Sequence, residues 1–347
     1  MEIIELINVK REFKILNRRE GIAGGIKDLF SRDYRYLSAV DDISLKIKKG
    51  EIVGYLGSNG AGKSTTIKMM TGILEPTSGK VLVNGKEPYR NRIENAQDIG
   101  VVFGQRSQLW WSLPLKESFK VLKEIYQVSD KDYKDMLDLY MSLIDIKNLW
   151  DKPVRQMSLG QRTLSDILAA FLHNPSVVYL DEPTIGLDVS MKSKIQEFIK
   201  GLNSQKATTV ILTTHDMGDV DALCNRIVII DKGKKLYDDN IENLHKMFGM
   251  YRIMKICFSK DVGELDYDSL KDKAAELEKE LQENFSGDDM TVSVDEGWID
   301  ILMNEEDVSL MEVMNFIQSK QHIYNIKLEE ISTEKVIKKI YEGGTIL

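Results

Sequence analysis

A glycine-rich turn between residues 57 and 65 has the residue types and spacing of a phosphate-binding loop. It follows the apolar run Ile52–Leu56 and leads into a stretch of helical composition. Glycines let consecutive main-chain N–H groups converge on phosphate oxygens, and the N-terminus of a helix adds a positive dipole. The residues of this predicted phosphate loop are Gly57, Ser58, Asn59, Gly60, Ala61, Gly62, Lys63, Ser64 and Thr65.

Two side chains of the phosphate loop have individual predicted roles. Lys63 can reach the terminal phosphates of a nucleoside triphosphate, and the Ser64 hydroxyl can ligate Mg²⁺. The alternative is a turn that merely joins a strand to a helix, which the Lys-Ser pair at the required spacing disfavours. The sequence therefore predicts a site for a nucleoside triphosphate with Mg²⁺.

A pair of carboxylates, Asp181 and Glu182, follows the apolar run 177–180. A buried strand that ends in this way can place both carboxylates beside the phosphates. Asp181 suits the Mg²⁺ shell, and Glu182 suits orienting or deprotonating the attacking water, because phosphoryl transfer depends mainly on positioning and charge neutralisation. A strand that only exits into an acidic turn is the alternative, which the upstream phosphate loop disfavours.

Three further motifs complete a recognisable series. Residues 157–162 read Met-Ser-Leu-Gly-Gln-Arg, residues 186–188 read Gly-Leu-Asp, and residues 212–216 read Leu-Thr-Thr-His-Asp. With the phosphate loop, the acidic strand and Gln105 at the end of Val-Val-Phe-Gly-Gln, they resemble the ATP-binding subunits of ABC transporters. Those subunits carry a Walker A loop, a glutamine loop, an LSGGQ signature, a Walker B strand, a D-loop and a switch histidine in that order. The resemblance implies ATP hydrolysis by an α/β P-loop NTPase core with a helical subdomain.

The resemblance also assigns roles to residues outside the phosphate loop. Gln105 matches the glutamine that touches Mg²⁺ and the attacking water, and His215 matches the switch histidine at the γ-phosphate. Phe13 matches the aromatic residue shortly after the first strand that stacks on adenine, with ordinary packing as the alternative. The residues implied to complete the ATP site across a dimer are Ser158, Gly160 and Gln161 of the signature, and Asp188 matches the D-loop aspartate.

The signature departs from LSGGQ at two positions. Met157 conserves the bulk of leucine, whereas Leu159 removes the freedom of glycine to adopt positive φ and would crowd the main chain where it approaches a phosphate. We expect a working signature with altered contacts. Ser-Leu-Gly-Gln could instead cap a helix that begins near Gln161.

Composition and length restrict the class of protein. The chain has 347 residues, 42% of them hydrophobic, which is enough for two domains with sizeable cores, and its net charge of −8 argues against a nucleic-acid partner. Cys224 and Cys257 are too few for a disulfide framework or a zinc site, which fits a reducing cytoplasm. No signal peptide or transmembrane run is evident. We expect attachment to the cytoplasmic face of the membrane through separate permease subunits.

Periodicity predicts two domains. Residues 1–245 form the predicted ATPase domain, whose uniformly apolar strands between residues 176 and 230 indicate a parallel sheet covered on both faces. Its predicted helical subdomain spans about 112–170. Residues 250–347 follow the order strand, helix, strand, strand, helix, strand, which predicts a small ferredoxin-like α+β domain without a catalytic constellation.

Two segments are candidates for contact with a membrane partner. Residues 17–37 form an insertion between Phe13 and the second strand, and their pattern predicts a short basic amphipathic helix. That helix could dock on the permease, lie near anionic headgroups or pack on its own domain. Trp110 and Trp111 follow the glutamine loop, where ABC ATPases receive a coupling helix, and burial against the helical subdomain is the alternative.

The insertion, the stretch 104–111 and the Ser-Leu-Gly-Gln signature together resemble the ABC-2 type exporter ATPases, such as sodium-efflux and daunorubicin-resistance ATPases. That resemblance implies export through ABC-2 type permeases, driven by closure of an ATPase dimer, and intact motifs make a homodimer the simpler assumption. An importer ATPase and a soluble ABC ATPase without a membrane partner are the alternatives. The transported substrate is not indicated by the sequence.

Overall fold

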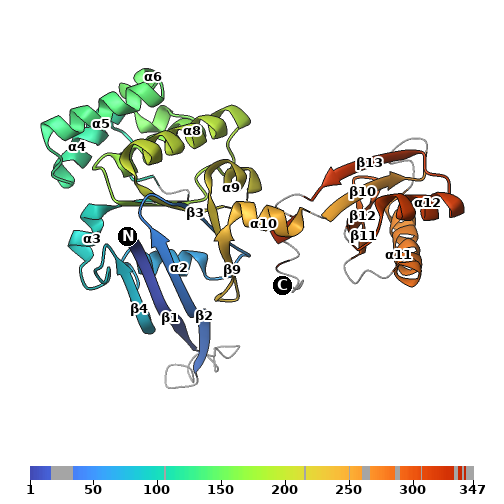
Figure 1. Cartoon of the computed structure of the whole chain (residues 1–347). Helices are drawn as coiled ribbons and strands as arrows, with labels where there is room; N and C mark the ends of the chain where they lie inside the picture. Colours follow the sequence, from blue (N-terminus) through green and yellow to red (C-terminus); the bar gives the residue numbers. More distant parts are fainter. Residues whose placement is uncertain are drawn as a thin grey trace, which may run out of the picture. The chain divides into compact units, whose positions relative to one another are not determined.

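The computed structural model describes residues 1–16, 34–104, 107–214, 216–249, 251–259, 266–285, 290–305, 307–331, 335–337 and 340. The chain divides into two compact units, residues 1–241 (unit 1) and 242–347 (unit 2) (Figure 1). Gln105, His215 and residues 17–33 of the predicted insertion lie outside the described residues. Their predicted structure and roles therefore stay predictions.

A six-stranded sheet forms the centre of unit 1, with the order β5-β6-β7-β3-β8-β9. Neighbouring strands are parallel except for β8 and β9, which are antiparallel. The inner strands are buried along almost their whole length, which confirms the predicted parallel sheet covered on both faces. The strands are β3 (Ile52–Gly57), β5 (Ile99–Phe103), β6 (Val177–Asp181), β7 (Thr209–Thr213), β8 (Arg226–Asp231) and β9 (Lys234–Asn240).

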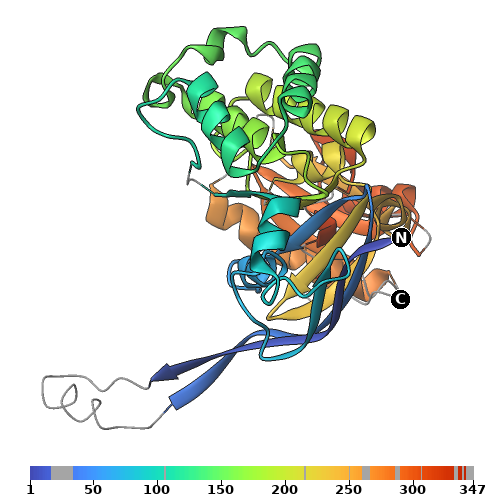
Figure 2. The ribbon, with the colours of Figure 1, turned by 90° about the vertical axis from the view of Figure 1, so that its left-hand side faces the viewer.

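A second, three-stranded antiparallel sheet has the order β2-β1-β4. It consists of β1 (Glu2–Leu16), β2 (Tyr34–Lys48) and β4 (Ser78–Val83). Figure 2 shows β1 and β2 running side by side away from the other strands, and their pairing continues to Leu16 and Tyr34. Residues 34–37, which the sequence analysis placed in the insertion before the second strand, belong to that strand, β2.

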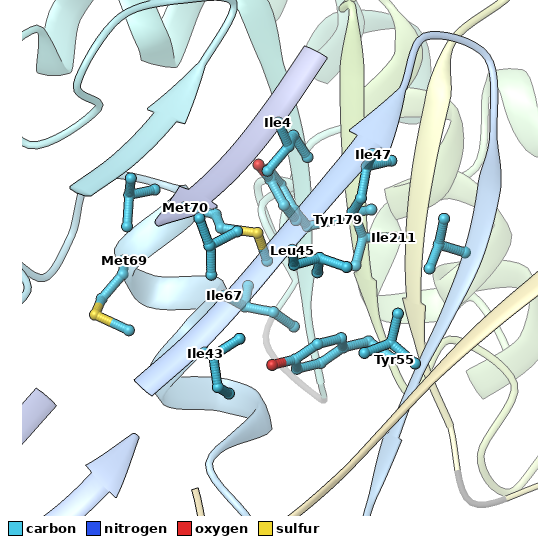
Figure 3. Packing of buried hydrophobic residues seen from close by; sticks show 14 of the residues in the cluster. Ile4, Ile43, Leu45, Ile47, Tyr55, Ile67, Met69, Met70, Tyr179 and Ile211 are labelled. Atoms are coloured by element: carbon cyan, nitrogen blue, oxygen red, sulfur yellow. The ribbon is translucent and has the colours of Figure 1, made fainter. Parts of the chain in front are cut away.

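An apolar core of unit 1 lies between the two sheets. Helix α2 (Lys63–Met70) packs there, with Ile67, Met69 and Met70 buried among side chains of both sheets (Figure 3). Residues from β1 and β2 face it on one side, and Tyr55 and Tyr179 of the large sheet face it on the other. Because α2 follows the phosphate loop directly, this core fixes the position of the loop.

Helices make up the rest of unit 1. Helices α4 (Leu115–Ile125) and α5 (Asp130–Leu143) lie within the range of the predicted helical subdomain. The Tyr140 hydroxyl of α5 donates to the Leu168 carbonyl of α7 (Leu159–Phe171) across 2.7 Å. Figure 1 shows α4, α5, α6 and α8 gathered on one side of this unit. The helices are α3 (Arg92–Asp98), α4 (Leu115–Ile125), α5 (Asp130–Leu143), α6 (Lys147–Trp150), α7 (Leu159–Phe171), α8 (Val189–Lys206) and α9 (Met217–Leu223).

Unit 2 has the predicted ferredoxin-like arrangement. Its four strands are antiparallel in the order β11-β12-β10-β13, and its two longer helices pack on the sheet through one apolar cluster. The elements are β10 (Tyr251–Cys257), α11 (Tyr267–Asn284), β11 (Thr291–Asp295), β12 (Trp298–Asn304), α12 (Leu310–Lys320) and β13 (Asn325–Glu330); α10 (Ile241–Phe248) precedes them. Across the described part of both units, no helix has the length and apolar character needed to span a membrane.

Candidate functional site

A pocket of about 330 Å³ lies where the phosphate loop meets the carboxyl end of β6. It brings together both halves of the site that the sequence predicts. Ala39 of β2 is an additional lining residue, which no motif in the sequence marks. The pocket is lined by Ala39, Ser58, Asn59, Gly60, Gly62, Lys63, Ser64, Thr65, Asp181 and Glu182.

Glycine is required at two positions of the phosphate loop. Gly62 has φ 108°, and a Cβ there would lie 2.4 Å from the Ala39 carbonyl oxygen. At Gly57, which ends β3, a Cβ would lie 2.7 Å from the Ile230 carbonyl oxygen. The loop can therefore pass this close to neighbouring main chain only without side chains at these positions.

Lys63 is folded back over the phosphate loop. Its Nζ donates to the Gly57 carbonyl across 2.6 Å and to the Ser58 carbonyl across 3.2 Å. Burial lowers the pKa of Lys63, while the negative charges of Glu182 and Asp181 act in the opposite direction. Main-chain carbonyls thus hold the ammonium group in a pocket that is also lined by Ser64 and Thr65, whose hydroxyl groups could donate to an anion.

The two carboxylates at the end of β6 are positioned by β7. Asp181 accepts a hydrogen bond from the Thr213 hydroxyl at 2.5 Å, and the Glu182 N–H donates to the Thr213 carbonyl at 2.9 Å. Glu182 has φ 51°, a left-handed conformation that is uncommon outside glycine and turns the chain sharply after the strand. The main chain therefore fixes Glu182 at the edge of the pocket.

Hard oxygen donors for a cation are present in the same pocket. The Ser64 hydroxyl and the Asp181 carboxylate both line it, and Ser64 is exposed. The described residues contain no cluster of three or more His, Cys, Asp or Glu side chains that could hold a metal. Such a small donor set fits Mg²⁺, which takes much of its coordination from water and substrate phosphates.

The signature residues form a helix cap. The Ser158 hydroxyl accepts from the Gln161 N–H at 3.3 Å, and the Gln161 side-chain oxygen accepts from the Ser158 N–H at 3.2 Å. This reciprocal capping box starts α7 at Leu159, two residues earlier than the capping alternative placed it. Leu159 is helical and 49% exposed, so its own conformation does not use a positive φ, and its crowding of a bound phosphate stays a prediction.

The predicted D-loop residue is also a helix cap. The Asp188 carboxylate accepts from the Met191 N–H at 3.0 Å and begins α8. Neither Asp188 nor the signature residues Ser158, Gly160 and Gln161 line the pocket around Lys63. Their contact with ATP stays a prediction.

Phe13 lies inside β1, not after it as the sequence suggested. It pairs with Leu37 of β2, it is partly buried, and the Arg11 guanidinium lies 4.8 Å from its ring centroid. Phe13 is not among the residues that line the pocket, and its stacking on adenine stays a prediction.

Trp110 and Trp111 are 38% and 53% exposed on unit 1. Within this unit, the alternative of burial against the helical subdomain is wrong for both side chains. The Arg162 guanidinium of α7 lies 4.6 Å from the Trp111 ring centroid, which orients that ring without covering it.

Asp219 does not line the pocket but bonds to segments that adjoin it, and the sequence reasoning missed this residue. It is fully buried in α9, and its carboxylate accepts from Gln196 Nε2 at 2.7 Å, from the Thr214 hydroxyl at 3.2 Å and from the Thr184 hydroxyl. Lys192 Nζ lies 3.5 Å from the same carboxylate. Asp219 therefore ties the segment after Glu182 to the segment before position 215. The sequence carries no clear signal for it, because an aspartate next to Val220 looks like an ordinary surface charge.

Comparison with known proteins gives consistent matches. The family model described as ABC transporter matches residues 40–185. The ABC transporter ATP-binding protein NatA of Bacillus subtilis is 32% identical over 217 residues, which cover 62% of this chain and 88% of NatA. The bacitracin transport ATP-binding protein BcrA of Bacillus licheniformis is 27% identical over 313 residues, covering 90% of this chain and 95% of BcrA. The methionine import ATP-binding protein MetN of Geobacillus kaustophilus is 33% identical over 202 residues, covering 57% and 59%.

Solved structures show the same architecture. CbiO1 of Clostridium perfringens, part of the ABC transporter complex cbiONQ, aligns with a TM-score of 0.58 at 25% identity, covering 71% of this chain and 91% of cbiO1. A bacterial ABC transporter cassette solved as a dimer aligns with a TM-score of 0.56 at 26% identity, covering 69% and 98%.

A phosphate loop at the carboxyl end of an inner strand of a parallel sheet is the architecture of the P-loop NTPases, and this chain is one of them. Its 32% sequence identity to NatA, over 88% of that protein, assigns it to one family among these NTPases. The chain belongs to the ATP-binding proteins of ABC transporters, and it is an ATP-binding and ATP-hydrolysing subunit of that family.

Proposed function

We propose that this chain hydrolyses Mg-ATP in a homodimer and thereby powers export through separate ABC-2 type permease subunits at the cytoplasmic face of the membrane. The main support is the match to BcrA, which covers 90% of this chain, whereas unit 1 holds only residues 1–241 of 347. The match must therefore extend into unit 2. BcrA is a bacitracin transport ATP-binding protein, so a relative that matches in both units takes part in transport.

Each residue of the pocket has a role in this proposal. Main-chain N–H groups of the phosphate loop and Lys63 bind the β- and γ-phosphates, since Lys63 can exchange its carbonyl partners for phosphate oxygens. Glu182 orients the attacking water and accepts its proton. Gln105 and His215 complete this set in the roles implied by the family resemblance.

Ser64 and Asp181 are the residues that would hold Mg²⁺, together with Gln105. The cation, when bound, neutralises charge on the phosphates. Thr213 keeps the Asp181 carboxylate in a fixed orientation through its 2.5 Å hydrogen bond. The protein side chains thus supply a small, preset group of oxygen donors.

A second copy is needed to complete each ATP site in this proposal. Ser158, Gly160, Gln161 and Asp188 do not line the pocket of their own chain, and a related cassette with 26% identity was solved as a dimer. We infer that these residues meet the γ-phosphate of ATP bound to the other copy. Because all catalytic motifs are present in this chain, both sites of a homodimer would be active.

The permease contact and the direction of transport rest on separate observations. The exposed Trp110 and Trp111 are the anchors proposed for a permease helix. Export follows from the resemblance of residues 104–111 and of the signature to the ABC-2 exporters. Import is the second candidate, because MetN, a methionine import protein, is 33% identical over 202 residues.

The division of labour between domains is part of the proposal. Residues 1–245 would form the ATPase domain, with its helical subdomain at about 112–170, and residues 250–347 an accessory domain. Limited proteolysis with and without Mg-ATP would test this. Cleavage between residues 240 and 250 should release two protease-resistant fragments, and ATP should protect the N-terminal one.

The first experiment compares full-length wild-type protein with Glu182→Gln in the presence of Mg-ATP. Loss of the water-activating carboxylate should abolish turnover and leave a stable dimer, because ATP binding favours the closed form and is no longer followed by hydrolysis. Glu197→Gln, an exposed position on α8, is the matched control and should behave as wild type. A Glu182→Gln protein that turns over ATP normally would remove Glu182 from the mechanism.

A second experiment tests the partner and the direction. Tagged chain is purified from detergent-solubilised membranes, and a polytopic membrane protein should co-purify in fixed proportion. Reconstitution of that complex with ATP on the outside of vesicles should move substrate into the lumen if the complex exports. Movement out of the lumen would favour the importer, and absence of any membrane protein would favour a soluble ABC ATPase.

A further inference from the structure

A buried carboxylate in α7, the helix that begins at the signature and is called the signature helix below, binds residues 107 and 108, which follow the glutamine loop. Asp166 lies on α7, only 6% exposed, and one of its carboxylate oxygens accepts from the Ser107 hydroxyl at 2.9 Å and from the Gln108 N–H at 3.0 Å. The main-chain carbonyl of Asp166 accepts from Gln108 Nε2 at 3.0 Å. Three hydrogen bonds therefore join a single helical residue to two consecutive residues of the segment.

The bonded segment has a particular position in the chain. Residues 107–109 come directly after Gln105 and Arg106 and directly before Trp110 and Trp111. The Leu109 N–H donates to the Ser107 hydroxyl at 3.1 Å, and the Leu109 side chain is buried. The hydrogen bonds to Asp166 thus hold a tight local turn between the glutamine loop and the exposed tryptophans.

The far end of this segment is held by residues that adjoin the signature. The Arg155 N–H donates to the Trp111 carbonyl at 2.9 Å, and the Val154 N–H donates to the Leu113 carbonyl at 3.2 Å. Arg162, one turn before Asp166 on α7, lies over the Trp111 ring. The segment 107–113 is therefore held at both ends: its start is bonded to α7, and its end is bonded to the turn at 154–155 that precedes α7.

The Asp166 carboxylate serves to hold residues 107 and 108 and contributes little to the charged surface, because it is buried. A carboxylate this deeply buried is unfavourable unless its oxygens are hydrogen-bonded, and burial raises the pKa of Asp166, with its hydrogen bonds to Ser107 and Gln108 opposing that rise. Removal of the carboxylate would leave the Gln108 N–H and the Ser107 hydroxyl without this acceptor. Arg162 is the charged group that acts on Asp166 most directly.

We propose that Asp166 is a positioning residue that makes the segment 107–113 and the signature helix move as one body. Displacement of Trp110 and Trp111 is then passed to Ser158 at the start of the same helix, and the signature is held in the orientation that hydrolysis requires. The part of this inference that concerns a permease at the tryptophans rests on the function proposed above. The hydrogen bonds of Asp166 and their effect on ATP hydrolysis can be measured on the chain without a permease.

The test uses full-length Asp166→Ala and Asp166→Asn. Asparagine keeps a side-chain oxygen that can accept both bonds, whereas alanine keeps none. Thr163→Ala, at a partly exposed position one turn earlier on α7, is the matched control. Four quantities are measured: hydrogen exchange of peptides that contain residues 107–113, kcat for ATP hydrolysis, KM for ATP, and the Kd of ATP.

For Asp166→Ala we expect exchange of the Gln108 and Leu109 amides to rise about tenfold and kcat to fall severalfold, with the Kd of ATP within about twofold of wild type. Asp166→Asn and Thr163→Ala should show exchange no faster than wild type and should retain wild-type kcat. Wild-type exchange in Asp166→Ala, or faster exchange with unchanged kcat, would each overturn the proposal. So would an equal loss of kcat in Asp166→Asn.

Ser107→Ala provides a second route to the same test if Asp166→Ala does not fold. It removes one donor from the other side of the contact and should raise exchange of the Gln108 and Leu109 amides with a smaller fall in kcat. Wild-type values in both measurements would contradict the fastening. Because none of these measurements includes a permease, a failure of the transport proposal leaves their outcome unchanged.

Discussion

Gly160 of the signature helix lies so close to Met191 of α8 that a Cβ at Gly160 would be 2.6 Å from the Met191 Cγ. A side chain at position 160 would therefore have to displace the Met191 side chain, independently of any phosphate contact. The neighbouring Leu159 has a helical main chain and is 49% exposed, so it meets no such restriction. Packing within the chain thus disfavours a side chain at position 160 and places no such restriction on position 159.

The close approach predicts a destabilising effect of Gly160→Ala. An added methyl group must displace Met191, and overpacking of this kind lowers the free energy of unfolding by about 1–3 kcal/mol. Met191→Ala should relieve the clash, so the double variant should be more stable than the sum of the two single effects predicts. Denaturant unfolding of the four proteins measures this coupling. Additive effects would show that the two side chains do not meet.

Ser158 has two separable functions, a helix cap in this structure and a predicted phosphate contact. Ser158→Ala should lose about 1 kcal/mol of stability together with ATP hydrolysis. Ser158→Asp should retain the stability, because aspartate is an equally good cap, and should still lose hydrolysis because its charge repels the γ-phosphate. Thermal unfolding and steady-state ATPase assays distinguish the two functions. Normal turnover in Ser158→Asp would leave only the cap.

Asp219 should be important for stability as well as for catalysis. Asp219→Ala leaves buried hydroxyl and amide donors of Thr184, Thr214 and Gln196 without their common acceptor, which should lower the free energy of unfolding by about 2–4 kcal/mol. Gln196→Ala, which removes one partner, should cost less. Hydrolysis by Asp219→Ala should fall while the protein is still folded, because the segments after Glu182 and before position 215 lose their link. Equal stability of Asp219→Ala and wild type would refute the network.

Much of the fold could be predicted because its signals are local. Uniformly apolar strands such as Val177–Leu180 indicate a parallel sheet, and glycines around Lys63 indicate a phosphate loop. The extension of β1 could not be seen in the same way. Residues 10–14 are partly or fully exposed and the β1–β2 ladder contains register shifts, so no regular apolar alternation marks that part of the strand.

The two buried aspartates show a second limit of sequence reasoning. Asp166 and Asp219 look like ordinary surface charges in the printed sequence, because their partners come from segments far away in the chain. Asp166 is 59 residues from Ser107, and Asp219 is 35 residues from Thr184. Only the tertiary arrangement brings the donors together. Asp188 is a different case. The family motif singles it out as a D-loop residue, and its helix-capping bond to Met191, three residues on, is local in sequence.

Asp166 should also make stability depend on pH. Burial raises the pKa of its carboxyl from 3.8 to about 6 in the folded protein. Between pH 3.8 and pH 6 the folded state therefore binds more protons than the unfolded state. The contribution of Asp166 to the free energy of unfolding is fully present below pH 3.8. About 3 kcal/mol of it is lost as the pH rises to 6. Asp166→Asn should therefore gain stability relative to wild type across this window. A stability difference that does not change with pH would contradict the raised pKa.

His173 should act in the opposite direction. Its ring stacks on Tyr126 with centroids 3.8 Å apart and donates to the Ile99 carbonyl at 3.0 Å, and burial lowers the pKa of His173 from 6.5 to about 4. Its contribution is present above pH 6.5 and is lost as pH falls through 4, again by about 3 kcal/mol. His173→Gln, which keeps a donor but does not titrate, should remove this loss.

The opposing slopes of Asp166 and His173 predict that they nearly cancel in the wild-type protein between pH 4 and pH 6. Each single variant should then expose the slope of the residue that remains. Asp166→Asn should lose stability on acidification, His173→Gln should gain it, and the double variant should return to the shallow wild-type dependence. Unfolding by urea at several pH values measures all four slopes. Single variants with parallel slopes would mean that one of these two groups does not titrate in the folded state as its burial implies.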